Sequence, residues 1–303
     1  MNRKNFKLQV ENCKLNVTTT INSNNGVVVV LHGGPGSGAQ PLMDLPAFQA
    51  LEKEFSCVYF DQRGSGKSEY DLTNELSIKQ ITQDVKSVVD YCKEEFAGQP
   101  VYLWGGSFGG LLSLLFLEKY PTAVDKAIIS SPAIHIASKY TQQFQLNEIK
   151  STFPHLFGQE NLLYEKIGKV ISNATSVNEI MDIKEFSDWI FENRKPMKGF
   201  EGLWHAFAMR KWMSDTDMRS SIKNIQIKTL FLMGVEDPII PANELIEAVA
   251  EYKNDKVDLK LFSPCGHAVF EDCKDEFVKT CKQFYTSDQI CHCSAVVILK
   301  TAV

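Results

Sequence analysis

Short, unbroken apolar runs recur along the chain, and patterns of helical length lie between several of them. The run at 27–31 is four valines and a leucine, and looser runs occupy 56–60, 101–104, 126–130, 228–233 and 257–262. Strands that are apolar throughout are buried on both faces of a sheet, and such sheets are mostly parallel. Helical patterns occur at 78–96, 108–120, 242–252 and 271–284. This alternation predicts a doubly wound α/β core around a mostly parallel sheet.

Two other patterns interrupt or extend this core. The segments 6–10 and 14–20 alternate roughly between apolar and polar residues around a short turn, which predicts an antiparallel hairpin. Between 134 and 222 the alternation of strands and helices stops, and the sequence becomes helical and aromatic. We interpret this stretch as a helical lid inserted into the core. The predicted division is an α/β core formed by 1–133 and 223–286, a lid at 134–222 and a C-terminal tail at 287–303.

The composition is that of a globular protein without the cluster of basic residues that nucleic-acid binding requires. Of the 303 residues, 44% are hydrophobic and 11% aromatic, which suffices for a sizeable core. Lys and Arg together number 32 against 37 Asp and Glu, so the formal net charge is −5, and no block of like charges occurs. Because nucleic-acid binding needs a clustered basic face, we expect no nucleic-acid partner.

Neither a membrane segment nor a metal site is predicted. The N-terminus lacks the apolar run of a signal peptide, and no stretch reaches the roughly 18 apolar residues of a membrane span. We therefore expect a cytoplasmic protein without membrane contact, whose eight cysteines stay reduced. Cys291-His292-Cys293 resembles a metal-binding pattern, but the nearest other cysteine lies ten positions upstream. We expect no metal and no cofactor.

Ser107 stands in a G-x-S-x-G motif between a predicted strand and a predicted helix. The motif runs from Gly105 to Gly109, directly after the strand at 101–104. A nucleophilic serine needs a sharp, strained turn of this kind to expose its hydroxyl above the sheet, and the flanking glycines let the strand and helix backbones approach. The context predicts that Ser107 is a catalytic nucleophile.

A glycine-rich loop follows the apolar run at 27–31, with the sequence His32-Gly33-Gly34-Pro35-Gly36. A tetrahedral intermediate of acyl transfer needs two preorganised N–H donors. We predict an oxyanion hole formed by the N–H groups of Gly34 and Phe108. The loop lacks the glycine spacing of a phosphate-binding loop, and we interpret His32 as a buried imidazole that supports the loop.

The candidate acid and base follow the last two predicted strands. Asp237 comes after the strand at 228–233, and His267 comes after the strand at 257–262. The order Ser, Asp, His, each in a loop after a strand, is that of the α/β-hydrolase fold. A serine needs an imidazole to accept its proton, and the imidazole needs a carboxylate to hold its tautomer. We predict a triad of Ser107, His267 and Asp237, with Glu236 and Asp272 as the rival acids.

Three segments resemble the proline iminopeptidase branch of the α/β-hydrolases, serine peptidases that remove an N-terminal residue, often proline. They are HGGPG at 32–36, DQRGSGKS at 61–68 and GGSFGG at 105–110. The resemblance extends over roughly residues 5–285 and is weak in the predicted lid. In the second segment we assign Asp61 and Arg63 to shaping their loop rather than to chemistry.

The resemblance also bears on the substrate. Family aminopeptidases bind the free amine of the substrate with acidic side chains, one often directly after the catalytic Asp and others in the lid. In this chain Pro238 follows Asp237, so the first of these acids is missing. In the predicted lid, Glu201 stands near the position of a lid glutamate, and Trp204 is the candidate for an apolar wall beside it. A Glu201 that faces solvent is the alternative.

Three functions remain open on these observations. The first is an aminopeptidase that acts on short peptides through an acyl-enzyme. The second is an esterase or small-amide hydrolase with the same triad, which the missing acid at Pro238 favours. The third is a non-enzymatic receptor that holds a ligand beneath the lid. The expected partner is a small peptide or ester, and the oligomeric state is left open.

Overall fold

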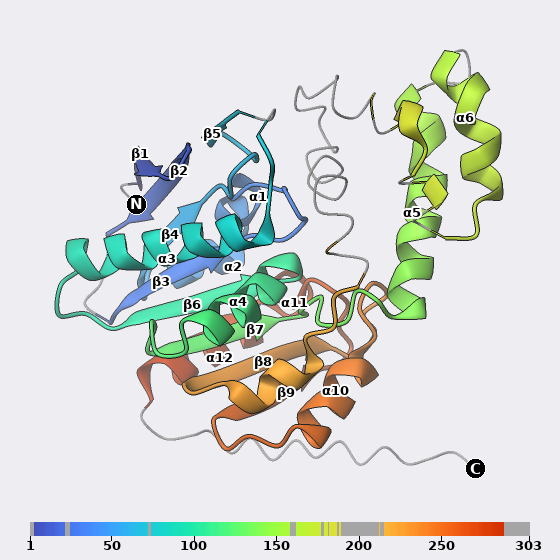
Figure 1. Cartoon of the computed structure of the whole chain (residues 1–303). Coiled ribbons are helices and arrows are strands. Elements are labelled where there is room, and N and C mark those ends of the chain that lie inside the picture. The colour runs from blue at the N-terminus through green and yellow to red at the C-terminus, as the bar shows by residue number, and fades with distance from the viewer. Residues whose placement is uncertain are drawn as a thin grey trace, which may run out of the picture.

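Figure 1 presents a computed structural model of the chain, in which a central sheet carries helices on both faces. The residues that the structure describes are 3–21, 25–71, 74–157, 162–176, 179–180, 182–186, 188, 212 and 215–287. The predicted tail from 288 onward and much of the second half of the predicted lid lie outside these residues.

The sheet combines an antiparallel edge with a parallel body. Its strand order is β1 (Arg3–Val10), β2 (Cys13–Thr20), β4 (Ser56–Phe60), β3 (Val27–Leu31), β6 (Val101–Gly106), β7 (Lys126–Ser130), β8 (Lys228–Gly234) and β9 (Val257–Phe262), with β5 (Glu69–Tyr70) beside β2. Strands β1 and β2 form the predicted hairpin. All pairings from β4 through β9 are parallel. The prediction of a doubly wound, mostly parallel α/β core is confirmed.

Helices bury both faces of this sheet. One face is covered by α3 (Ile78–Glu95), α4 (Phe108–Lys119), η1 (Arg219–Asn224) and α10 (Ala242–Glu251), and the other by α1 (Gln40–Asp44), α2 (Pro46–Leu51), α11 (Val269–Asp272) and α12 (Lys274–Thr286). Successive residues of β3 enter opposite cores, since Val29 and Leu31 pack on the first face and Val28 and Val30 on the second. Burial of both faces explains why the parallel strands are apolar without alternation.

Helix α3 illustrates how local sequence sets an element. Its N-terminus carries a capping box, in which the Gln80 N–H donates to the Ser77 hydroxyl at 3.3 Å and the Ser77 N–H donates to Gln80 Oε1 at 3.1 Å. Both bonds satisfy N–H groups that a helix start leaves without partners. Farther along, Ile81, Val85 and Val88 follow the helical period and are fully buried against the sheet.

The structure differs from the predicted elements in several places. The helical pattern at 271–284 is two helices, α11 and α12, which are separated at Cys273. Helices α1 and α2 were not predicted, because elements of five and six residues are too short to display a helical period. Strand β9 is only partly buried along most of its length, because it is the edge of the sheet and pairs with β8 alone.

The segment between β7 and β8 leaves and re-enters the core at one place. The Ala137 N–H donates to Thr216 O at 3.2 Å, and the Met218 N–H donates to Ile134 O at 2.8 Å, so the outgoing and returning chains pair. The described part of the segment contains α5 (Lys139–Phe157) and α6 (Leu162–Asn173), which pack on each other and stand apart from the sheet in Figure 1. Its action as a lid stays a prediction. Among the described helices, none has the length and apolar character needed to span a membrane.

One buried ion pair links the loop after β4 to α3. Arg63 donates from Nε and Nη2 to both carboxylate oxygens of Asp84, each at 2.6 Å, and the two side chains are 2% and 1% exposed. Burial raises the pKa of Asp84, and the Arg63 guanidinium opposes that rise. A third bond, from Arg63 Nη2, reaches Glu11 O in the β1–β2 turn at 3.3 Å. Arg63 therefore holds its loop in place, as its assignment to a structural role predicts.

Replacing Arg63 should destabilise the fold strongly. In Arg63→Ala, Asp84 keeps its buried carboxylate without a counter-ion, and loss of one partner of such a pair costs about 3–5 kcal/mol. The free energy of unfolding from urea titration measures this loss. Lys86→Ala is the control. Lys86 Nζ pairs with Asp90 Oδ1 at 2.7 Å on the surface of α3, the helix that also carries Asp84, and such surface pairs contribute about 0.5 kcal/mol. Equal effects of the two variants would contradict the structural role of Arg63.

Candidate active site

Ser107 occupies a strained turn between β6 and α4. Its backbone has φ 56° and ψ −119°, in a region that residues with a Cβ rarely adopt. The turn is held because the Ser107 N–H donates to Ser130 O at 2.9 Å and Ser107 O accepts the N–H of Ala133 at 3.2 Å. Ser130 is the last residue of β7, and Ala133 directly precedes the predicted inserted segment at 134–222. Ser107 therefore lies at the carboxyl edge of the sheet, where the inserted segment starts.

Two glycines make this turn possible. A Cβ on Gly105 would lie 2.3 Å from Gly109 O, and a Cβ on Gly109 would lie 2.2 Å from Leu31 O. Both contacts are far shorter than van der Waals distance, and both involve backbone atoms that cannot rotate away. The motif glycines therefore let α4 approach β3 and β6 closely, as their flanking positions predict.

The glycine-rich loop after β3 lies against the same turn. A Cβ on Gly33 would lie 3.3 Å from Ser107 Cβ and 3.8 Å from Ser107 Oγ. Gly34 has φ 113°, which favours glycine, and a Cβ there would lie 2.7 Å from Gly36 N. Within the described parts of the chain, the N–H groups of Gly34 and Phe108 have no hydrogen-bond acceptor. The structure thus places the loop beside Ser107 and leaves both predicted donors available.

His32 is buried beneath the glycine-rich loop and binds its backbone. It is 1% exposed, and its Nε2 accepts the N–H of Gln62 at 3.1 Å. The proton is therefore assigned to Nδ1, which lies 2.9 Å from Gly33 O. The Gln62 side chain in turn donates to His32 O at 2.9 Å. With both ring nitrogens engaged in the loop, His32 has the structural role that the sequence predicts.

Asp61 joins the same loop to its neighbours. Its Oδ1 accepts the N–H of Ala39 at 2.7 Å, and its Oδ2 accepts the N–H of Lys67 at 2.8 Å and the Asn16 side-chain amide at 3.0 Å. Gly66 leaves room for the carboxylate, since a Cβ there would lie 2.3 Å from Asp61 Cγ. Asp61 therefore binds the end of the glycine-rich loop, the DQRGSGKS loop and β2 together.

Asp237 and His267 meet above the ends of β8 and β9. His267 Nδ1–H donates to Asp237 Oδ2 at 2.7 Å, and Asp237 Oδ1 accepts the N–H groups of Ile239 at 2.8 Å and Ile240 at 2.9 Å. The Asp237 side chain is fully buried, whereas that of His267 is 21% exposed. Both carboxylate oxygens are thus fixed, and His267 Nε2 is the ring nitrogen left for proton exchange.

The two rival acids bind the backbone of the loop that carries His267. Glu236 Oε2 accepts the N–H of Cys265 at 2.7 Å, and this bond is the main cause of the lowered pKa of Glu236. Asp272 Oδ2 accepts the N–H of Gly266 at 2.8 Å. In both cases the carboxylate binds a backbone N–H and not the His267 imidazole. Glu236 and Asp272 therefore hold the loop that carries His267. The sequence pointed to them only as alternatives to Asp237, not as supports of this loop.

The candidate residues share one edge of the sheet. Ser107 follows β6, Asp237 follows β8 and His267 follows β9, and these strands are parallel through β7. The carboxyl ends of parallel strands meet at the same edge, which is where open α/β sheets bind ligands.

Several predicted site residues lie beyond what the structure describes. Glu201 and Trp204 fall outside the described residues, as does the tail sequence Cys291-His292-Cys293. Among the described residues, no group of three or more His, Cys, Asp or Glu side chains is arranged to hold a metal ion.

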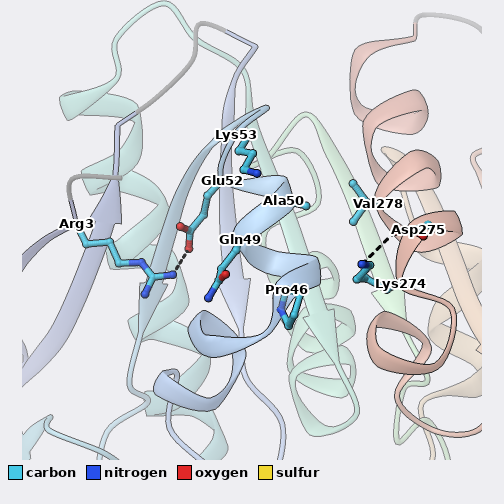
Figure 2. Close-up of a pocket in the computed structure, with 9 residues that line it drawn as sticks. All are labelled: Arg3, Pro46, Gln49, Ala50, Glu52, Lys53, Lys274, Asp275 and Val278. Atoms are coloured by element: carbon cyan, nitrogen blue, oxygen red, sulfur yellow. Dashed lines mark hydrogen bonds and ion pairs between the residues drawn. The ribbon is translucent and has the colours of Figure 1, made fainter.

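A separate surface hollow lies away from the candidate site. Its volume is about 700 Å³, and its walls come from β1, α2 and the start of α12. Figure 2 shows the two ion pairs beside it, Arg3 with Glu52 at 2.8 Å and Lys274 with Asp275 at 3.3 Å. Because none of the candidate residues lines it, this hollow is not assigned to the substrate.

Solved structures place the fold among the α/β hydrolases. The α/β hydrolase MGS-M2 from a deep-sea metagenome library superposes with a TM-score of 0.65 at 18% identity, covering 94% of this chain and 98% of that one. An esterase from Exiguobacterium antarcticum gives a TM-score of 0.63 at 20% identity, covering 91% and 96%. The fold is therefore that of an α/β hydrolase, as the sequence predicts.

The family follows from sequence comparison. A family model described as "Serine aminopeptidase, S33" matches residues 22–274, and the chain belongs to this family. A proline iminopeptidase of Thermoplasma volcanium is 24% identical, covering 85% of this chain and 88% of that protein. A proline iminopeptidase of Pestalotiopsis fici is 27% identical, covering 84% and 89%. The protein is a serine hydrolase, which confirms the prediction of an enzyme over a non-enzymatic receptor.

Substituting Gly109 should damage the site through its backbone packing. In Gly109→Ala, the new Cβ meets Leu31 O, so α4 or β3 must shift, at a cost of about 1–3 kcal/mol. Gly110→Ala is the control, because it adds the same methyl group to the same helix with a longer contact. A Cβ at position 110 would lie 3.0 Å from Pro132 Cα and Cβ, against 2.2 Å from Leu31 O for a Cβ at position 109. Thermal unfolding and hydrolase activity should both fall further in Gly109→Ala. A Gly109→Ala protein as stable and active as Gly110→Ala would contradict the close approach.

Proposed function

We propose that Ser107, His267 and Asp237 act as one catalytic triad, and that the protein is an aminopeptidase that releases an N-terminal residue from short peptides. Proline is the first candidate for that residue. The observation that carries the triad is the 2.7 Å hydrogen bond from His267 to a fully buried Asp237 carboxylate. That pair stands on the same sheet edge as the strained Ser107 turn.

In the proposed reaction, His267 Nε2 takes the proton of Ser107 Oγ as that oxygen attacks the carbonyl carbon of the substrate. Asp237 holds Nδ1 protonated and stabilises the imidazolium that forms. The carbonyl oxygen becomes an oxyanion, which the N–H groups of Gly34 and Phe108 stabilise. His267 then returns the proton to the leaving nitrogen, and an acyl-enzyme on Ser107 remains. A water molecule, deprotonated by His267, hydrolyses this ester and restores Ser107.

The assignment of a peptide substrate rests on the relatives. The proteins of T. volcanium and P. fici that match most of this chain are named proline iminopeptidases. A substrate with a free N-terminal ammonium needs an anionic partner in a water-poor site, because an unpaired buried charge costs several kcal/mol. We propose that Glu201 supplies it and Trp204 the adjacent apolar wall, within an inserted segment that acts as a lid at 134–222.

An esterase with the same triad is the second candidate. Pro238 favours it, because the residue after Asp237 cannot supply an acid to the amine of a peptide. The hydroxyl of Tyr140 also donates to Pro238 O at 3.2 Å, so this position is occupied by a contact from α5. The leaving group decides between the two candidates, and the chemistry on Ser107 is common to both.

Substitution of the triad should remove turnover while leaving the fold intact. Ser107→Ala should lower kcat by about 10,000-fold or more and abolish labelling by a fluorophosphonate, because it removes the attacking oxygen. Asp237→Asn should lower kcat by about 1,000-fold or more, since an amide favours the wrong imidazole tautomer. Asp272→Asn is the matched control and should keep most of the activity, because its oxygen still accepts the Gly266 N–H. A larger loss in Asp272→Asn than in Asp237→Asn would contradict the assigned acid.

The amine partner is tested by comparing two substrate types. Glu201→Gln should raise KM for aminoacyl amides about tenfold, which corresponds to about 1.4 kcal/mol of lost pairing, and should leave simple acyl esters unaffected. Steady-state kinetics on both substrate types measure the effect, with Glu148→Gln and Glu192→Gln measured beside it as the alternative acids of the same segment. Equal losses on amides and esters would assign Glu201 to supporting the segment. Turnover of esters without turnover of aminoacyl amides by the unmodified enzyme would favour the esterase.

A further inference from the structure

Two thiols flank the loop that carries His267. Cys265 lies two residues before the histidine, and Cys273 separates α11 from α12. Cys273 Sγ lies 3.7 Å from Pro264 O, the carbonyl bonded to the nitrogen of Cys265, and Cys265 Sγ lies 3.7 Å from Gly266 O. The two sulfur atoms therefore lie beside the same short turn, although seven residues stand between the two cysteines in the sequence.

The two thiols differ in their access to solvent. Cys265 is 4% exposed, whereas Cys273 is the partly exposed one among the cysteines that the structure describes. Burial, and then interaction with the Cys273 side chain, raises the pKa of the Cys265 thiol to about 12. The remaining described cysteines are buried in the core at Cys13, Cys57, Cys92 and Cys281. Among these described cysteines, a reagent from solvent reaches Cys273 first, and the thiol beside it is Cys265.

We propose that Cys265 and Cys273 are a reversible thiol-modification site, which a low-molecular-weight disulfide such as glutathione disulfide converts into an intramolecular disulfide that slows hydrolysis. Neither the triad nor the oxyanion hole uses these thiols. The effect on turnover rests on the proposed role of His267, whereas the formation of the disulfide does not.

The exchange proceeds in two balanced steps. The Cys273 thiolate attacks one sulfur of glutathione disulfide, the bond between its sulfurs breaks, and one glutathione leaves as its thiolate. The Cys265 thiolate then attacks Cys273 Sγ in the mixed disulfide and releases the second glutathione. The protein loses two electrons, glutathione disulfide gains them, and the two thiol protons pass to the two glutathione thiolates. The first step also removes the Cys273 thiol, which helps to raise the pKa of Cys265.

A disulfide here would act on the support of His267. The backbone of Cys265 is tied to Glu236 on both sides, by its N–H to Oε2 at 2.7 Å and by its carbonyl to the Glu236 N–H at 3.0 Å. The next N–H, of Gly266, is bound by Asp272, the neighbour of Cys273. A disulfide requires particular Cα–Cα and Cβ–Cβ separations. Its formation would therefore strain these hydrogen bonds and displace His267 from Asp237.

The test uses the full chain with the tail thiols removed, in a Cys291→Ser/Cys293→Ser background. The protein is incubated with glutathione disulfide, free thiols are blocked with N-ethylmaleimide, and peptide mapping by mass spectrometry locates the linkage. We expect a Cys265–Cys273 link and a loss of kcat/KM of about tenfold or more, since a displacement near 1 Å can cost about 100-fold. Dithiothreitol should restore both the thiols and the activity.

Cys273→Ser in the same background is the control variant. It should keep the basal activity, form no link and lose no activity in glutathione disulfide. Absence of a Cys265–Cys273 link in the parent protein would overturn the proposal, as would a link that leaves kcat/KM unchanged or an equal loss of activity in Cys273→Ser. If Ser107→Ala retained full turnover before oxidation, the triad would fail, and the mapped link would still decide whether the thiols form this site.

Discussion

The close approach of α4 to β3 and β6 is the constraint on which the rest of the site depends. Gly105 and Gly109 allow backbone atoms to lie where any Cβ would stand within 2.3 Å of them. That approach turns the chain sharply at Ser107, and it brings the glycine-rich loop after β3 against the same turn. Because the contacts are between main-chain atoms of packed elements, no rotamer change relieves an added methyl group. Rigid secondary structure therefore positions Ser107, the proposed nucleophile, and precise catalytic geometry needs such rigid support.

Buried polar groups then hold the loops that this packing brings together. Asp61 and His32 bind the backbone around the glycine-rich loop, and Glu236 and Asp272 bind the backbone around His267. Each carboxylate accepts N–H groups from a loop that has no regular structure of its own. Preorganised donors and acceptors need no rearrangement when charge develops on a substrate. The loop that carries His267 depends on these few bonds for its position. A disulfide between the neighbouring thiols Cys265 and Cys273 would therefore disturb it.

Substrate choice is separated from this machinery. One solved structure that shares the fold is an esterase, whereas the relatives from T. volcanium and P. fici that match most of the chain are named proline iminopeptidases. A fold of this kind hosts many leaving groups, and the particular site selects among them. In this chain, the stretch between β7 and β8 enters directly beside Ser107, through the bond from Ala133 to Ser107 O. If that stretch acts as the proposed lid, differences in it alter the choice of substrate without disturbing the sheet.

The strands, the order of the loops and the serine motif could all be predicted from the amino-acid sequence. Apolar runs such as Val27–Leu31 report burial on both faces, and G-x-S-x-G between strand and helix reports a turn that only glycine permits. The sequence favoured Asp237 as the acid but left Glu236 and Asp272 as rivals, because adjacency along the chain says nothing about the direction of a side chain. The folded structure was needed to show that Asp237 meets His267, thirty residues away, and that Cys273 lies beside the loop of Cys265. Such pairings depend on how neighbouring strands end in space, which periodicity along one chain does not encode.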